Sequence, residues 1–314
     1  MQGYRGHFLL TVDVEDWFQV ENLRPWNPRS AWDSKELRVE ENTQRILDLL
    51  DSFSPNSPPG SGDSRVQDAN LGSKPSVPLV ATFFMLGWVA RRLPGLVREI
   101  AARGHEVASH GYSHDMCTSL SQDQLRQDLD RSKKLLEDIL GAPVKGYRAP
   151  NFSVTPNVLE VVRQCGYRYD SSYNSFSFNT RYGRMDFSKL PRIGSAFRLE
   201  HDFYEIPISN LPFYGRTLPM GGGGYFRLLP WLLFRAGIRR ILEQQGAYMF
   251  YFHPWEIDPR QPRIGKRLGR SGLKHYMNLA RTEKRLRHMF QDFAACRFVT
   301  CSQYLSSDPG PEQP

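Results

Sequence analysis

Cysteine is scarce in this sequence, and none of it is arranged as a metal-binding or redox motif. There are four cysteines among 314 residues, and no two of them form CxxC. Cys296 and Cys301 are close together, but four scattered cysteines indicate no disulfide framework. Reduced, buried thiols are the expected state, which is typical of a cytosolic protein.

Long apolar runs are also missing. No stretch approaches the ~20 apolar residues that a membrane span requires. The N-terminal segment has neither the apolar region nor the cleavage site of a signal peptide, because Asp13, Glu15 and Asp16 interrupt its apolar run. We therefore expect a cytoplasmic protein, either free or peripheral to the inner membrane.

Acidic residues are outnumbered, since 41 Lys and Arg against 33 Asp and Glu give a net charge of +8. The excess is concentrated in Arg260–His288, within a basic C-terminal extension expected at about residues 260–314. This tract is either a solvated helical face or a surface for an anionic membrane or an acidic glycan. No nucleic-acid-binding module is recognisable, so nucleic acid is not an expected partner.

Strand-like and helix-like segments alternate along the first half of the chain. Short apolar runs predict strands, and apolar residues at helical spacing predict helices between them. The expected strands are Phe8–Val14, Leu79–Leu86, His105–Ser109, Lys145–Ala149 and, in the less regular second half, Tyr248–Phe252. This alternation predicts an α/β fold with a parallel sheet, either open or closed into a barrel.

Two segments stand apart from this pattern. Residues 54–78 are rich in Pro, Gly, Ser, Asn and Asp, and the strand pattern resumes directly after them. We interpret them as a surface insertion within a single domain that spans residues 1–314. Gly221–Gly224 is predicted to be a loop, which either lines a sugar groove or forms a structural turn.

Polar side chains follow four of the predicted strands at the point where each strand ends. In parallel α/β folds, functional residues gather at the carboxyl ends of the strands. The residues in these places are Asp13, Glu15, Asp16, His110, His114, Arg148 and His253. We therefore expect them to lie together.

His110 and His114 are the candidate metal ligands. Two imidazoles four residues apart can meet one ion, and two histidines with a carboxylate leave coordination open for water, as in catalytic zinc sites. The spacing alone is weak evidence, because two nearby histidines are often unrelated core or surface residues. Glu is absent between them, so this is not the H-E-x-x-H protease motif.

Taken together, these residues belong to motifs that resemble a known family, the polysaccharide deacetylases (NodB-homology family). Within it, the sequence is most similar to proteins associated with bacterial exopolysaccharide and exosortase loci. The motifs are Thr11-Val-Asp-Val-Glu-Asp-Trp-Phe18, Ala81-Thr-Phe-Phe84, Gly104-His-Glu-Val-Ala-Ser-His-Gly-Tyr-Ser-His114, Gly146-Tyr-Arg-Ala-Pro150, Tyr169-Asp-Ser-Ser172, Gly222-Gly-Gly-Tyr-Phe-Arg-Leu228 and Tyr251-Phe-His-Pro-Trp-Glu-Ile257.

The resemblance implies a distorted (β/α) barrel that binds a divalent metal, usually Zn²⁺. It implies that Asp13 is the general base, that Arg148 orients this base, and that His253 is the general acid. His110 and His114 would bind the metal together with a carboxylate. The implied reaction is hydrolysis of N-acetyl groups on hexosamine residues of a polysaccharide or a lipid-linked glycan intermediate.

The carboxylate ligand is open, because the family's two adjacent Asp residues are separated here by Val14 and Glu15. Strand alternation places Glu15 on the same face as Asp13. A turn at the strand end would instead present Asp16. We predict Asp16, the family's residue type, with Glu15 as the alternative.

Further residues are candidates for contact with the glycan. The resemblance implies a backbone oxyanion donor near Asn151, which departs from the family pattern by preceding the aromatic Phe152. Four aromatic side chains are candidates for stacking on sugar rings, although aromatic residues near a core are often only packing. They are Trp17, Tyr112, Phe152 and Trp255.

Two other functions fit the same sequence. The barrel is also used to cleave other C–N bonds, including cyclic amides of the allantoinase kind. A catalytically silent glycan-binding or assembly protein is the second alternative, although such a protein has no physical need to keep the whole set of polar residues.

Overall fold

The computed structural model describes residues 6–54, 78–176, 185–264 and 274–307. The strands of its main sheet are β1 (His7–Val14), β2 (Thr82–Met85), β3 (Glu106–Ser109), β4 (Gly146–Tyr147), β5 (Tyr169–Asp170), β6 (Arg192–Ile193), β7 (Ala196–Glu200), β8 (Phe203–Glu205), β11 (Ala247–Phe252) and β12 (Arg297–Phe298). They are ordered β11-β1-β2-β3-β4-β5-β8-β7-β6, and β12 also pairs with β1. The strands from β11 to β8 are parallel, whereas β7 and β6 are antiparallel.

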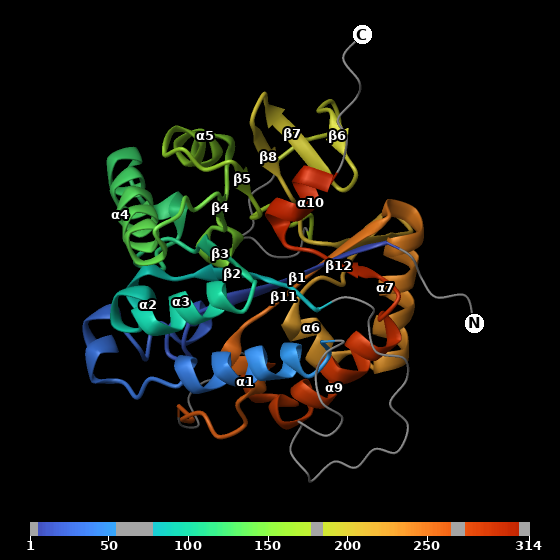
Figure 1. Ribbon diagram of the computed structural model, residues 1–314, viewed down its shortest axis with the longest axis horizontal. Coiled ribbons are helices and arrows are strands. Elements are labelled where there is room, and N and C mark those ends of the chain that lie inside the picture. Colours follow the sequence, from blue (N-terminus) through green and yellow to red (C-terminus); the bar gives the residue numbers. More distant parts are fainter. Residues whose placement is uncertain (1–5, 55–77, 177–184, 265–273, 308–314) are drawn as a thin grey trace.

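Helices surround this sheet (Figure 1). They are α1 (Val39–Asp51), α2 (Gly87–Arg92), α3 (Pro94–Ala102), α4 (Gln122–Leu140), α5 (Pro156–Gln164), α6 (Gly223–Leu228), α7 (Trp231–Gln245), α9 (Leu279–Asp292) and α10 (Cys301–Ser307). Short 3-10 turns are η1 (Glu21–Leu23), η2 (Arg29–Ser34), η3 (Cys117–Ser119), η4 (Pro150–Phe152) and η5 (Pro254–Ile257), and β9 (Asn210–Phe213) pairs with β10 (Arg216–Pro219). The predicted alternation of parallel strands and helices is confirmed.

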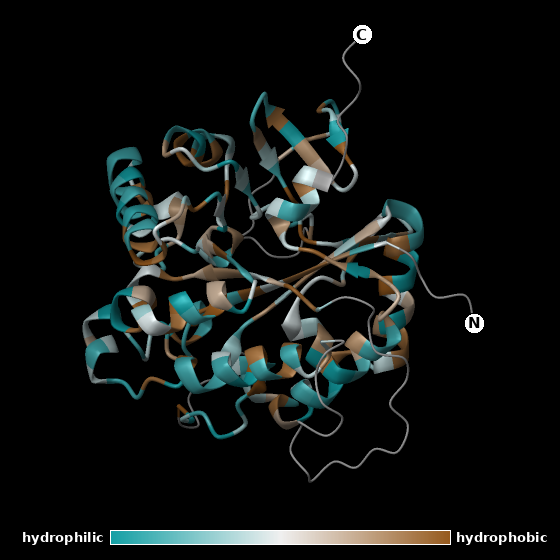
Figure 2. Cartoon of the chain, in the orientation of Figure 1, coloured by the Kyte–Doolittle hydropathy of each residue, from teal (hydrophilic) through white to brown (hydrophobic). Residues whose placement is uncertain are grey.

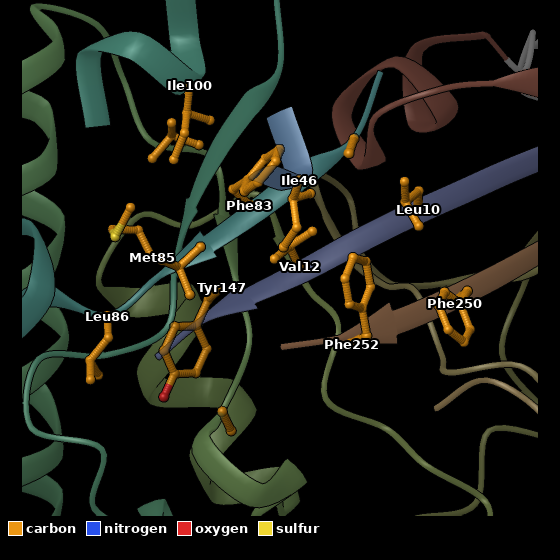
Figure 3. Close-up of a cluster of buried hydrophobic side chains, with 14 of the residues drawn as sticks. Leu10, Val12, Ile46, Phe83, Met85, Leu86, Ile100, Tyr147, Phe250 and Phe252 are labelled. Atoms are coloured by element: carbon orange, nitrogen blue, oxygen red, sulfur yellow. The ribbon is translucent and has the colours of Figure 1, made fainter. Parts of the chain in front are cut away.

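Side-chain alternation along β1 divides the core into two layers. Leu10 and Val12 belong to the larger apolar cluster between the sheet and its helices, where Ile46 of α1 also lies (Figure 3). Leu9 belongs to a second apolar cluster on the opposite face. Because successive side chains of a strand alternate, Asp13 lies on the face of Leu9. Figure 2 shows the same arrangement, with central strands that are mostly apolar and helices of mixed character.

The helix α4 begins with a capping box and holds the loop that follows β3. Ser121 is its N-cap: the side chains of Ser121 and Gln124 each accept a hydrogen bond from the other's backbone N–H. Two turns later, Asp128 accepts hydrogen bonds from the backbone N–H groups of Tyr112 and Ser113 at 2.7 and 3.0 Å. A sequence-encoded helix start therefore fixes a loop of the candidate site.

The predicted loop at Gly221–Gly224 is wrong in part, because α6 begins at Gly223. Glycine is required here by close packing. A Cβ on Gly223 would lie 2.4 Å from the Glu256 carboxylate, and one on Gly222 would lie 2.8 Å from the Tyr251 hydroxyl. This segment is a tightly packed junction beside β11.

The described parts of the C-terminal region are built into the fold. β12 pairs with β1, and Leu286, Met289 and Phe290 of α9 are buried in the main core. The remainder of the expected extension lies outside the described residues, as does the expected insertion except for its ends at Ser54 and Pro78. All four cysteines are free thiols. Within the described ranges, every helix is too short or too polar to cross a bilayer.

A pair of buried carboxyl groups joins β5 to β8. Asp170 and Glu205 are register partners and are fully buried. Burial raises the pKa of both groups, and the Asp170 carboxylate raises that of Glu205 further. Both effects favour the protonated form, so we expect the pair to share one proton in the folded chain.

This pair predicts that folding stability falls as the pH rises. In the unfolded chain both carboxyls ionise near pH 4, whereas the folded chain retains a proton. The unfolded state therefore binds fewer protons, and the free energy of unfolding decreases above that pH. Glu205→Gln should reduce the difference between denaturant titrations at pH 5 and pH 8. An unchanged difference would show that the pair is ionised when folded.

Candidate metal centre and active site

Three side chains at the ends of β1 and β3 form a group that could hold a metal ion. The ligand atoms of Glu15, His110 and His114 all lie within 4.8 Å of one another, and all three residues are buried. We call these residues the metal-binding group. The structure thus brings both predicted histidines together with Glu15, and two imidazoles with one carboxylate form a donor set that suits a catalytic metal site.

The hydrogen bonds of the metal-binding group fit an ion. Nδ1 of His110 lies 2.8 Å from the carbonyl oxygen of Arg148, so Nδ1 carries the proton and Nε2 is left as a ligand. Oε2 of Glu15 is buried, has no hydrogen-bond partner among the described residues, and lies 2.5 Å from Nε2 of His114. A bound ion would give this buried oxygen a partner.

The loop that presents the histidines has a tightly constrained backbone. Gly111 has φ = 72° and His114 has φ = 56°, both in the left-handed region. A Cβ on Gly111 would lie 2.8 Å from the Asp128 carboxylate that holds the loop. The Gly between the two histidines is therefore a requirement of the motif, because it brings the backbone against α4.

Asp16, the predicted carboxylate ligand, serves a different purpose. Its Oδ2 accepts hydrogen bonds from the backbone N–H groups of Arg38 and Val39, at 2.8 and 2.9 Å, and its Oδ1 accepts one from Trp17. It thus satisfies backbone donors at the start of α1. The strand alternation of β1 continues to Glu15, so the alternative ligand is the one that meets the histidines.

This difference gives a direct prediction. Glu15→Gln should lose bound metal, because an amide is a much weaker ligand than a carboxylate. Asp16→Asn should keep the metal and lose about 1–3 kcal/mol of stability, because a backbone N–H at the start of α1 loses its acceptor. Elemental analysis and denaturant unfolding check the two results. Metal loss in Asp16→Asn alone would restore Asp16 as the ligand.

The Asp13–Arg148 ion pair lies beside the metal-binding group. Nη1 of Arg148 donates to Oδ1 of Asp13 at 2.7 Å, and both side chains are almost completely buried. Nη1 also donates to Thr11 at 2.7 Å, while Nε and Nη2 donate to the carbonyl and hydroxyl oxygens of Ser171. The contact with Asp13 is made through a single nitrogen, not through a bidentate fork.

His253 completes the cluster from the end of β11. Its Nε2 lies 4.0 Å from Oδ2 of Asp13 and 3.5 Å from Oε1 of Glu15. Its Nδ1 lies 2.9 Å from Oε1 of Glu256, and Arg227 donates to the other oxygen of Glu256 at 2.7 Å. Glu256 therefore fixes the imidazole with Nε2 facing the site.

The pKa values of Glu15 and His253 are shifted in opposite directions. Burial raises the pKa of Glu15, but the nearby imidazoles of His114 and His253 outweigh burial and lower this pKa to about 2. Burial lowers the pKa of His253, but Glu15, Glu256 and Asp13 outweigh burial and raise this pKa to about 9. At neutral pH the site thus contains an ionised carboxylate and an imidazolium.

Two further groups were missed as site residues. Ser171 holds the Arg148 guanidinium, and Glu256 holds His253. Both lie within the motifs that carry the family resemblance, and Glu256 stands three residues after His253, which is capping-box spacing. That spacing could have identified Glu256; no local pattern distinguishes Ser171 from Ser172.

The predicted aromatic contacts are buried. Trp17, Tyr112, Phe152 and Trp255 are 4–6% exposed, which leaves little ring surface for a sugar. Trp255 stacks on His253 and on His275, with ring centroids 5.2 and 4.4 Å apart. Their role in stacking on sugars stays a prediction.

Comparison with known proteins places this site in a family. Residues 78–169 match the family model described as polysaccharide deacetylase, and residues 171–306 match one described as a domain of unknown function (DUF3473). Residues 78–169 therefore form a polysaccharide deacetylase domain. The narrower resemblance to exopolysaccharide-associated and exosortase-associated members stays a prediction.

Individual relatives agree with this family assignment. The chain is similar to a peptidoglycan-N-acetylglucosamine deacetylase of Bacillus cereus, at 32% identity over 80 residues, which are 26% of this chain and 29% of the relative. It is similar to a chitooligosaccharide deacetylase of Azorhizobium caulinodans, at 29% identity over 90 residues, which are 28% of this chain and 43% of the relative. The matched segments cover only 29% to 41% of the first four relatives.

The fold comparison covers far more of the chain. A solved structure from Mycobacterium smegmatis, described as a polysaccharide deacetylase, matches with a TM-score of 0.60 at 20% identity. The match covers 100% of this chain and 93% of that one. The predicted distorted (β/α) barrel is therefore confirmed.

Proposed function

We propose that this chain hydrolyses the N-acetyl group of a hexosamine residue in a polysaccharide or lipid-linked glycan, releasing acetate and a free amine. The observation that carries this proposal is the convergence of the metal-binding group, the Asp13–Arg148 ion pair and His253 at one end of the sheet. The carboxylate of Asp13 and the imidazolium of His253 are the base and acid that hydrolysis of an amide needs.

The metal we propose is Zn²⁺. Bound by Glu15, His110 and His114, it would polarise the attacking water and the acetamide carbonyl. The donor set of two imidazoles and one carboxylate, all buried, supports this choice.

Asp13 is the proposed general base. Nη1 of Arg148 donates a hydrogen bond to Oδ1 of Asp13 at 2.7 Å, which leaves Oδ2 to accept a proton from water. The guanidinium also compensates the charge of this carboxylate, which is buried. Arg148 is itself fixed by Thr11 and Ser171, so Asp13 is held in one orientation throughout the reaction.

His253 is the proposed general acid. Its Nδ1 is bound to Glu256, so the proton on Nε2 faces the site and can pass to the departing amine. A pKa raised to about 9 keeps the ring protonated at neutral pH, before the C–N bond breaks. Glu256 is a positioning residue, because it acts on the substrate only through His253.

Asn151 is the proposed contact to the reacting amide. It follows Arg148 in a sharp turn, in which Asn151 and Phe152 both have φ = 56°. The Nδ2 of Asn151 is buried and has no hydrogen-bond partner in the described part of the chain. A side-chain donor left unpaired beside the site is suited to an acetamide or oxyanion oxygen.

The test is acetate release from defined glycans. The full chain is stripped with a chelator, reloaded with Zn²⁺, and assayed on N-acetylated chitooligosaccharides and on a cyclic ureide. We expect metal-dependent acetate release from the chitooligosaccharides only. Turnover of the ureide alone would instead assign a cyclic amidohydrolase. Glycan binding without acetate release in the loaded chain would assign a silent binding protein.

We also propose that the chain works on the cytoplasmic side of the membrane, at its surface. The support is the basic tract Arg260–His288, in which Glu283 offsets part of the charge through an ion pair with Arg287. Salt-sensitive sedimentation with anionic liposomes is expected. Sedimentation that is absent at low salt would remove this part of the proposal.

A further inference from the structure

A second polar cavity adjoins the loop of the two histidines. It has a volume of about 270 Å³, and its lining includes Tyr112 and Ser113, the residues between Gly111 and His114. The rest of the lining comes from η2, α2 and α4. None of these other residues belongs to the metal-binding group or to its base and acid.

Four arginines converge on this cavity from three separate elements. Arg29 comes from η2, Arg91 and Arg92 from the end of α2, and Arg131 from α4. The positive charges of arginine side chains repel one another when the fold brings them together. A cavity built in this way has an electrostatic cost that an anion would offset.

Aromatic rings hold two of these four guanidinium groups in place. The guanidinium carbon of Arg92 lies 3.6 Å from the ring centre of Trp88, and that of Arg131 lies 3.6 Å from the ring centre of Tyr112. Nη2 of Arg131 also donates to the Tyr112 hydroxyl at 2.9 Å. Stacked guanidinium groups are preorganised, so less side-chain entropy is lost when they bind a ligand.

Carboxylates neutralise only part of this charge. Asp33 pairs with Arg92, and Asp115 pairs with Arg29. No salt bridge to a carboxylate involves Arg91 or Arg131 in the described ranges. Asp115 is also shared with Arg24, and the carboxylate of Asp128 is bonded to the backbone N–H groups of Tyr112 and Ser113. Within the described residues, the guanidinium groups of Arg91 and Arg131 are thus left without a carboxylate partner.

We propose that this cavity, which we call the arginine cavity, binds a phosphoryl group. A phosphate monoester carries about −1.5 to −2 charges at neutral pH and three acceptor oxygens, which matches two uncompensated guanidinium forks. A single carboxylate would leave one of the two charges unmatched. This binding site is separate from the proposed catalytic residues, and ligand binding to it can be measured without an activity assay.

The position of the arginine cavity connects it to the site of the proposed function. Tyr112 supports Arg131 through its ring and hydroxyl, and it lies two residues from both His110 and His114. A phosphorylated ligand in the cavity would therefore contact the loop that carries the metal-binding histidines. The phosphoryl group can belong to the glycan itself or be free phosphate, and the two sources are separable by experiment.

The test compares phosphate binding by two double variants of the full, metal-loaded chain. Arg91→Gln with Arg131→Gln removes the two guanidinium groups that have no carboxylate partner. Arg98→Gln with Lys134→Gln is the control, because it removes the same charge from exposed positions on α3 and α4 outside the cavity. Both double variants keep the metal-binding group, so inorganic phosphate bound to the metal contributes equally.

We expect the cavity variant to bind inorganic phosphate about tenfold more weakly than the control in calorimetric titrations, since charge-assisted hydrogen bonds are lost. Equal affinities in the two variants would overturn the proposal. So would wild-type affinity for acetate that equals its affinity for phosphate. Each single variant is titrated as well, so that misfolding of one double variant leaves the comparison intact.

A second titration identifies the source of the phosphoryl group. N-acetylglucosamine 1-phosphate should bind the wild-type chain more tightly than inorganic phosphate if the group belongs to the glycan. The cavity variant should lose that advantage. Equal affinity for both ligands, with loss of both in the cavity variant, would assign the arginine cavity to free phosphate.

Discussion

Asp13→Asn should lower kcat by about 10²–10⁴-fold while leaving the metal bound, because it removes the general base and leaves every metal ligand in place. In the native chain, Oδ1 of Asp13 accepts a hydrogen bond from Nη1 of Arg148 at 2.7 Å. The amide oxygen of the variant can accept the same hydrogen bond. The site should therefore retain its geometry and lose only the group that takes the proton from water. Steady-state acetate release and elemental analysis of the same sample measure both results.

The control for this variant must remove a buried carboxylate from an ion pair elsewhere. Asp258 is suitable, because its side chain is 1% exposed and pairs with Arg38 at 2.5 Å, outside the catalytic cluster. Asp258→Asn should lose stability and keep kcat. If Asp13→Asn retained full activity, or if both variants lost kcat equally, the assignment of Asp13 as base would be wrong.

The sequence predicted the site to the extent that strand ends determine it. The five strands predicted from apolar runs are present. His110, Arg148 and His253 follow β3, β4 and β11. Their meeting is a consequence of parallel strand order, because β11, β1, β2, β3 and β4 are successive neighbours whose carboxyl ends share one edge.

The acidic ligand shows where this reasoning was insufficient. Whether Glu15 or Asp16 faces the histidines depends on where strand alternation gives way to a turn. That point is set by the backbone of Arg38 and Val39, 22 or more residues later, whose N–H groups need an acceptor and find it in Asp16. A long-range demand of this kind has no local sequence signal.

The supporting residues were missed for a related reason. Ser171 and Glu256 act through Arg148 and His253, and their roles follow from pairings across the sheet. In the second half of the chain, strands β5 to β10, strand β12 and helix α7 were not predicted. Strands β8, β7 and β6 complete the far edge of the main sheet, and β9 and β10 form a separate two-stranded sheet.

Arg148→Met should destabilise the chain by about 3–5 kcal/mol, because it leaves the Asp13 carboxylate buried without its partner. Arg148 is completely buried, and its guanidinium also bonds to Thr11 and Ser171, so their polar groups lose donors in the same step. Denaturant unfolding measures the loss. The matched control is Arg163→Met, which removes an exposed arginine paired with Glu160 and should change the stability little.

A second substitution separates the buried charge from the lost packing. If the cost of Arg148→Met arises from an uncompensated carboxylate, adding Asp13→Asn should restore part of the stability, because the remaining charge is removed. If the cost arises from packing alone, the two losses should add. Either way Arg148 supports activity only through Asp13. The double variant should therefore be as inactive as Asp13→Asn, even where its stability recovers.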